Sequence, residues 1–255
     1  MVILRRRDGA EGIIPGNMRN PFTGLKPEMA QSERTQQISE TALVRITRVW
    51  KAFTLPGLIS MIGVSKEGCD EVTQELMSRM KNIEYTAKDV EEFSKRLVTL
   101  QEGEENFPLK AGLFLSALIN NAKDEDFVVH TAQLKRKPTC LGYLNTKNVV
   151  VEGGLAWGAA YRMITGTFEV KGNIGKAGGR NMDCGELIIR GNAQKELGKQ
   201  MKGGKISTYG KVVSVGGDRK GGEIHLEGET EPYIEATRDG KIYKKGELFQ
   251  DGHGR

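Results

Sequence analysis

The side chains best suited to catalysis or metal binding are scattered along this 255-residue chain. The cysteines and histidines are Cys69, Cys140, Cys184, His130, His225 and His253. None shows the paired spacing, such as C-x-x-C or H-E-x-x-H, that is typical of zinc sites. We therefore expect no metal site, and a buried or surface role for each histidine.

The sequence also lacks the other common catalytic patterns. It has no P-loop motif, and its glycines lie between short strand-like segments, whereas a dinucleotide fingerprint lies between a strand and a helix. We therefore expect no cofactor, no catalytic residue and no activity of the chain alone. An acid–base pair built from residues distant in the sequence would leave no pattern, so an enzyme stays open as an alternative.

Basic residues give the strongest indication of binding chemistry. Lysines and arginines recur 19 positions apart in three pairs, which are Lys171 and Arg190, Lys176 and Lys195, and Arg180 and Lys199. If the chain repeats at that period, like charges lie about 5 Å apart and repel, which a purely structural design would not favour. We predict that these six residues form a basic face for an anionic partner. The alternative is a solvated face that keeps the protein soluble.

Charge is distributed unevenly over this half of the chain. Residues 153–220 contain 12 Lys or Arg against 5 Asp or Glu, whereas residues 221–255 contain 5 against 8. The whole chain has a formal net charge of +5 and a pI near 9.0. This balance is compatible with an RNA or ribosomal partner without requiring one.

A glycine repeat organises the residues from about 148 onward. One column of glycines comprises Gly153, Gly172, Gly191, Gly210, Gly228 and Gly246, and a second comprises Gly166, Gly185, Gly204, Gly222 and Gly240. Both columns are spaced by 18 or 19 residues and shorten at the same step. A fixed period of this size predicts a solenoid in which each repeat is one coil. A glycine-rich linker would lack the phased apolar columns described next.

Short segments of alternating polarity follow the second glycine column. Their expected inward positions include Phe168, Leu187, Ile206 and Ile224, and alternation with β-branched residues is typical of strands. A further column has one residue per repeat, two positions after each glycine of the first column, and it begins at Leu155 and ends at Leu248. Another column comprises Met163, Met182 and Met201. The prediction is a parallel β-helix, with the methionines in its core and Gly191 and Gly204 at corners that need positive φ. Outward-facing Val150 and Ile188 indicate that something covers them.

The spacing of these glycines resembles a known family. The runs Gly172–Gly185 and Gly191–Gly204 fit G-x-x-G-x-x-x-G followed by M-x-x-G, with departures at Gln194 and Val213. This resembles the GXGXG repeat of the C-terminal domain of glutamate synthase large subunits and is similar to the β-helical subunit of formylmethanofuran dehydrogenase. The resemblance covers about residues 145–246. It implies a right-handed parallel β-helix with a docking role and no catalytic residues.

The preceding residues have a different character. Residues 1–36 are predicted to form an irregular basic arm because glycine and proline punctuate them densely. Residues 37–105 carry helical apolar stripes and predict a helical domain that folds separately. Residues 106–134 predict a capping helix and strand, and residues 135–255 the β-helix. The predicted fold class is therefore α+β and multidomain.

These observations favour a non-catalytic docking protein in a larger complex. One alternative is an RNA- or ribosome-associated factor that uses the basic face. Another is a non-catalytic subunit of a glutamate synthase-like or formylmethanofuran dehydrogenase-like enzyme. The odd cysteine count and the lack of a signal or membrane-spanning segment predict a cytoplasmic location. We expect protein partners, and a homo-oligomer is compatible with the sequence.

Overall fold

The computed structural model describes residues 41–55, 65–236 and 239–251. They belong to one compact unit, Thr41–Arg255. The predicted arm at 1–36, residues 56–64 and His253 lie outside the described residues.

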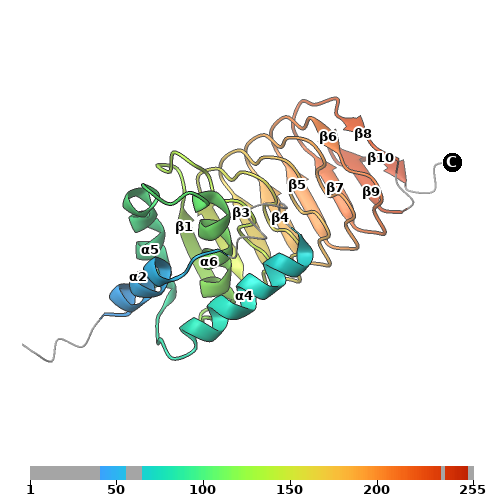
Figure 1. Ribbon diagram of the computed structural model, residues 1–255. Helices are drawn as coiled ribbons and strands as arrows, with labels where there is room; N and C mark the ends of the chain where they lie inside the picture. Colours follow the sequence, from blue (N-terminus) through green and yellow to red (C-terminus); the bar gives the residue numbers. More distant parts are fainter. Residues whose placement is uncertain (1–40, 56–64, 237–238, 252–255) are drawn as a thin grey trace, which may run out of the picture. The chain divides into compact units, whose positions relative to one another are not determined.

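The main element is a parallel β-solenoid of about six turns (Figure 1). Its principal sheet has eight strands in the order β1-β2-β3-β4-β5-β7-β9-β10. The strands are β1 (Asp126–His130), β2 (Asn148–Glu152), β3 (Thr167–Val170), β4 (Glu186–Ile189), β5 (Lys205–Thr208), β7 (Glu223–Leu226), β9 (Lys241–Lys244) and β10 (Glu247–Asp251). A second sheet pairs β6 (Ser214–Val215) with β8 (Tyr233–Ile234). The predicted solenoid is therefore confirmed, and its first strand, β1, precedes the boundary expected at residue 135.

The predicted strand register is correct. Phe168 pairs with Leu187, Leu187 with Ile206, and Ile206 with Ile224, and all four side chains are fully buried. A second inward column is formed by successive bridges from Leu155 to Ile174, from Ile174 to Ala193 and from Ala193 to Val212. Met163, Met182 and Met201 are also fully buried. Each coil is too thin to bury these side chains alone, so the stacking of coils forms the core.

The two glycine columns are required for different reasons. Gly204 has a φ of +81°, and the whole second column lies in this left-handed region that favours glycine. Gly191 is not in that region, so the expectation of positive φ is wrong there. A Cβ on Gly191 would instead lie 2.6 Å from the backbone of Gly172 in the preceding coil. Close stacking of the coils, and not the local dihedral angle, requires Gly172, Gly191, Gly210 and Gly228 of the first column, whereas Gly153 and Gly246 have positive φ.

The last strand departs from the repeat. β10 pairs with β9 antiparallel, with an irregularity between Leu248 and Gln250. Lys245 and Gly246 make the turn, and both have positive φ. The expectation that Leu248 continues the inward column is therefore wrong, since Leu248 is 53% exposed. The reversed strand ends the series of parallel coils.

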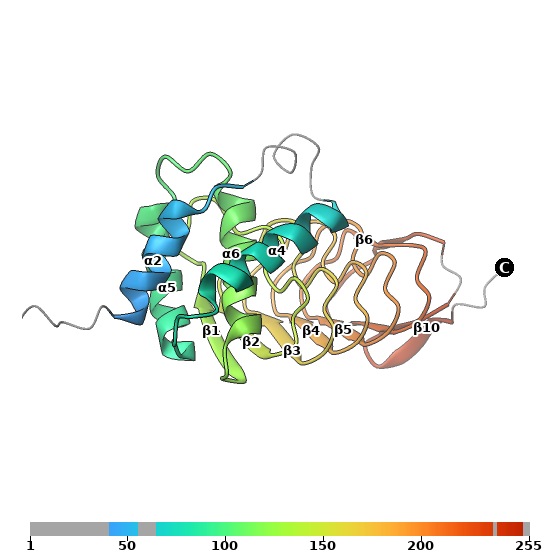
Figure 2. The ribbon, with the colours of Figure 1, turned by 60° about the horizontal axis from the view of Figure 1, so that its bottom comes forward.

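Four described helices precede or accompany the first strands. They are α2 (Ala42–Ala52), α4 (Lys66–Met80), α5 (Ala87–Leu100) and α6 (Phe107–Asn121). The predicted capping box of α5 is present, with Thr86 and Asp89 each bonding the other's backbone N–H. Pro108 stands one residue inside the start of α6, where its missing N–H has no intrahelical partner to lose. α4 lies along one side of the solenoid, away from the principal sheet (Figure 2).

α6 covers the coil that contains residues 139–144. A Cβ on Gly112 would meet the carbonyl oxygen of Thr139 at 1.7 Å, so the helix backbone packs directly on the coil. The Ser116 hydroxyl accepts a hydrogen bond from the Gly142 N–H, and the Pro108 carbonyl accepts one from the Thr139 N–H. α6 thereby satisfies backbone groups that other coils satisfy by stacking.

Helices and coils share one hydrophobic cluster, which extends from Ile46 in α2 to Ile242 in β9. Trp50 packs on Phe93 of α5 and also on Phe107 and Phe114 of α6, with ring centroids 5.2–6.0 Å apart. Aromatic packing therefore joins helices on both sides of the domain boundary that was expected at residue 105. Independent folding of residues 37–105 stays a prediction, and this shared core opposes it.

Candidate docking groove

The six predicted basic residues do not form one face. Lys171 and Arg190 lie beside the principal sheet, where both bind Oε1 of Glu169, at 2.8 Å and 2.7 Å. The hydrogen bonds from Lys171 and then Arg190 lower the pKa of the Glu169 carboxyl. One carboxylate thus offsets the repulsion that the 19-residue spacing implied.

Arg180 and Lys199 lie on another side of the coils. Lys199 pairs with Glu196 at 2.7 Å, and Arg180 donates to the side-chain oxygen of Gln200. The hydrogen bond from Lys199 lowers the pKa of Glu196, to which the charges of Arg180 and Lys176 also contribute. These two cations therefore already have polar partners within the solenoid.

Lys176 and Lys195 differ from the other four. Both are exposed, and among the described residues no carboxylate lies within ion-pair distance of either ammonium. Their coils are joined by hydrogen bonds from Gly158 N to Lys176 O and from Ala177 N to Lys195 O, both 2.9 Å. The two lysines thus lie on adjacent coils in one row.

The row continues in both directions with apolar side chains. Trp157 lies one coil before Lys176. On the coil after Lys195, Val213 stands one residue before Ser214, and Ser214 pairs with Tyr233 on the following coil. Val213 is 52% exposed and Tyr233 is 72% exposed, while Trp157 is partly exposed. We call these five residues, Trp157, Lys176, Lys195, Val213 and Tyr233, the groove row.

Two hollows follow this row and meet at Lys176. The first, of about 790 Å³, is lined by Trp157, Lys137 and Lys176 over a floor that includes Ala156 and Gly175. The second, of about 580 Å³, is lined by Lys176, Lys195, Val213, Tyr233, Glu196 and Glu235. We call the two hollows together the groove.

Small residues make the groove concave. Leu155 and Ile174 point inward, so the next residues, Ala156 and Gly175, face outward. A Cβ on Gly175 would lie 2.5 Å from the carbonyl oxygen of Ala156, so the coil spacing itself excludes a larger residue. The floor is consequently backbone and methyl groups, bordered by longer side chains.

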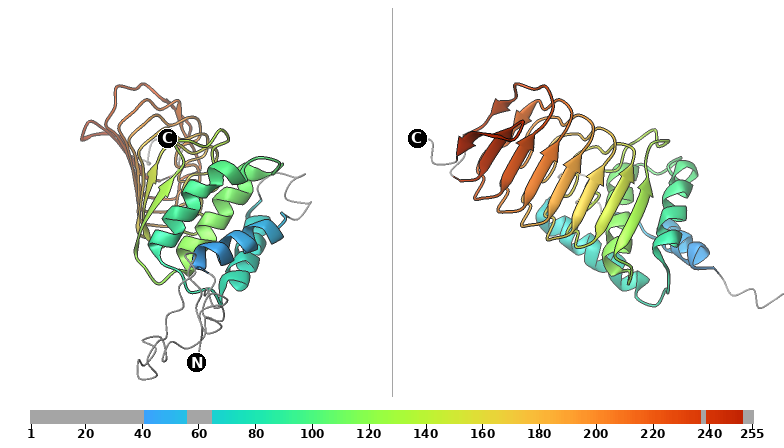
Figure 3. Two further views of the ribbon diagram at one scale, coloured as in Figure 1. Left: turned by 90° about the vertical axis from the view of Figure 1, so that its left-hand side faces the viewer. Right: turned by 180° about the vertical axis from the view of Figure 1, so that it is seen from behind.

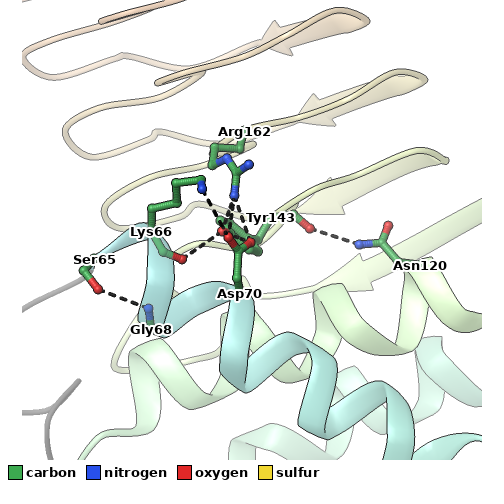
Figure 4. A network of polar contacts seen from close by, with 7 residues as sticks. All are labelled: Ser65, Lys66, Gly68, Asp70, Asn120, Tyr143 and Arg162. Atoms are coloured by element: carbon green, nitrogen blue, oxygen red, sulfur yellow. Dashed lines mark hydrogen bonds and ion pairs between the residues drawn. The ribbon is translucent and has the colours of Figure 1, made fainter.

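A second polar constellation joins α4 to the coils (Figure 4). The Tyr143 hydroxyl donates to Oδ1 of Asp70 at 2.7 Å, and Nη1 of Arg162 contacts both Asp70 oxygens at 2.8 and 3.0 Å. Burial, followed by the hydrogen bond to Asp70, raises the pKa of Tyr143. The hydroxyl therefore stays protonated and serves as a donor, which makes this cluster a structural contact between helix and solenoid.

The outer side of the principal sheet has no helix over it in the described part of the chain (Figure 3). Val150 and Ile188 are nevertheless only partly exposed, because neighbouring side chains on adjacent strands shield them. The described helices do not supply the cover that the sequence indicated for these residues, so a partner stays the other alternative.

Within residues 41–55, 65–236 and 239–251, no three His, Cys, Asp or Glu side chains are grouped so that they could hold a metal ion. No described helix has the length and apolar character needed to cross a membrane. Comparison of the chain with protein-family models, curated proteins and solved structures finds no match. The groove is thus assigned from its own geometry.

The sequence indicated Lys176 and Lys195 but not the rest of the groove row. Trp157 lies 19 residues before Lys176, so the same period would have placed it in the row. Tyr233 lies two steps of 19 residues after Lys195, so the same period also reaches it, whereas Val213 lies one residue outside this spacing. Concavity was not readable, because it depends on which small residues face outward.

Proposed function

We propose that this protein is a non-catalytic docking protein that binds a protein partner along the groove. The observation that carries this proposal is the exposed pair Lys176 and Lys195, which have no carboxylate within ion-pair distance in the described part of the chain and line hollows that also include Trp157 and Tyr233. Tryptophan and tyrosine side chains are enriched among the hot spots of protein interfaces. The core that helices and coils share gives such a surface a rigid base.

The resemblance to the GXGXG repeat is part of the same proposal. It supports right-handed winding and a place within a larger enzyme complex, where other chains would carry catalysis. A cytoplasmic location is supported by the two buried free cysteines, Cys69 and Cys140, since free thiols persist in reducing compartments.

The test compares two charge reversals of equal size. Lys176→Glu with Lys195→Glu changes the groove, and Lys81→Glu with Lys88→Glu changes two exposed lysines of the helical region. Lys199 is left intact because its pairing with Glu196 would confound the result. Each full-length variant is used as bait in native pull-downs, and its melting temperature is measured.

We expect the wild type and the helical-region variant to retain the same protein partner, and the groove variant to lose it at an unchanged melting temperature. Retention of the partner by the groove variant would refute docking at this site. Treatment with nuclease separates the second candidate, an RNA-associated factor, which the excess of basic residues in the middle coils favours. Loss of the complex after nuclease would support that candidate.

A further inference from the structure

The groove row has a definite order of chemistry along its length. Trp157 and Tyr233 stand at its two ends, Lys176 and Lys195 follow Trp157 on successive coils, and Val213 lies beside Ser214, which pairs with Tyr233. Neighbouring coils are about 4.8 Å apart, so the row from Trp157 to Tyr233 spans about 19 Å. An extended polypeptide rises about 3.3 Å per residue, so about six residues cover this length.

The charges of the groove select among anionic ligands. Glu196 and Glu235 line the same hollow as Lys195. Glu196 is paired with Lys199, and Glu235 accepts a hydrogen bond from the Gly217 N–H at 3.0 Å. Both carboxyl groups are therefore held in the groove wall by these contacts. A nucleic-acid backbone carries a negative charge at every residue and would be repelled there.

A peptide can vary its charge along the row. Carboxylates two residues apart in an extended chain lie on one side of it, about 6.6 Å apart, and so can face Lys176 and Lys195 together. Apolar side chains before and after them would lie against Trp157 and against Val213 and Tyr233. The floor of Ala156 and Gly175 leaves room for the backbone of such a chain.

We infer that the groove binds an extended peptide segment of about six residues, with two carboxylates at its centre and apolar side chains at its ends. This inference rests on the proposed docking function and adds the chemistry of the partner. It also fixes the direction of selectivity: charge at the centre of the segment, apolar contact at its ends, and salt-sensitive affinity.

The experiment titrates the isotope-labelled full chain with terminally blocked peptides and follows backbone amide resonances. The probe is the peptide LAEGEAL. Matched probes are LAQGQAL, which lacks the charges, and AAEGEAA, which lacks the apolar ends, with octauridylate as the nucleic-acid probe. We expect LAEGEAL to shift amide resonances of the groove row and to bind at least tenfold more tightly than either altered peptide.

Two variants control for the site. Lys176→Gln with Lys195→Gln should reduce LAEGEAL binding at least tenfold, whereas Lys81→Gln with Lys88→Gln should leave it unchanged. Equal binding of LAQGQAL, tighter binding of octauridylate, or no shift in the groove row at millimolar peptide would each overturn the inference. If the peptide fails but the charge reversal still removes the native partner, docking stands and only the assigned ligand chemistry is wrong.

Discussion

Glu169 binds two cations from adjacent coils, and its side chain is only 15% exposed. The two hydrogen bonds favour the ionised carboxylate, which is why its pKa is lowered in the folded protein. Such a group stabilises the fold at pH values above its unfolded pKa. The stabilisation is lost as the pH falls through the folded pKa.

Replacement of Glu169 by glutamine should therefore matter more near neutral pH than in acid. We expect Glu169→Gln to lower the free energy of unfolding by about 0.5–1 kcal/mol near pH 7, as for other ion pairs close to the surface. The difference should be smaller at pH 3 than at pH 7, because the carboxylate becomes protonated as the pH falls through its folded pKa. Denaturant titrations at the two pH values measure it. Glu186→Gln, which removes a single pair with Lys205, is the matched control and should have a smaller effect. A constant difference at both pH values would contradict the assignment.

Three glycines allow the two reasons for glycine, positive φ and close backbone contact, to be tested separately. Gly103 has a φ of +74° with no atom near its missing Cβ, and Gly191 has close backbone neighbours without positive φ. Gly204 combines a φ of +81° with a carbonyl oxygen 2.6 Å from the position of a Cβ. Substitution by alanine at these sites thus isolates strain, contact and their combination.

We expect Gly103→Ala to cost about 1 kcal/mol, the ordinary penalty for a left-handed residue. Gly204→Ala should cost more, because the coil spacing must also open, and Gly191→Ala should be destabilising through contact alone. Thermal and denaturant unfolding of the three variants gives the order. If Gly204→Ala were no worse than Gly103→Ala, the stacked backbone would be more compliant than its contacts imply.

Among the elements, α6 decides whether the preceding helices can fold without the solenoid, because a fragment of residues 41–103 lacks it. Trp50 and Phe93 bury their rings against Phe114, which such a fragment lacks. A fragment of residues 1–103 should therefore show no cooperative thermal transition by circular dichroism, whereas the full chain should. A sigmoidal melting curve of the fragment would instead establish the separate helical domain that the sequence predicts.

The repeated elements were predictable because each coil of a solenoid needs the same residue types at the same positions, so its period appears in the sequence. Strand β5 and the buried stack through Ile206 follow from alternation and spacing alone. The reversal at β10 was missed because Gly246 keeps the 18-residue step, although two residues between strand-like segments also indicate a hairpin. Left-handed residues such as Ala177 and Glu196 were not readable, since stacking on neighbouring coils imposes their conformation.

Over the whole molecule, the 19-residue spacing predicted which basic residues stack but not which side of the coil they occupy. Lys171, Lys176 and Arg180 are close in sequence, yet they contact Glu169, line the groove and contact Gln200, respectively. A coil turns between such positions, so linear spacing alone cannot combine them into one face. Prediction of the groove would have required the three-dimensional path of the backbone at each corner.

The reversed strand β10 has a consequence for assembly. Stacked parallel coils could in principle accept further identical coils and grow into a filament by end-to-end addition. β10 runs antiparallel, carries an irregularity beside Leu248, and has acidic residues at both ends, Glu247 and Asp251. At the opposite end, α5 packs against β1. Both terminal strands are thus modified or covered, which opposes the end-to-end addition of further coils.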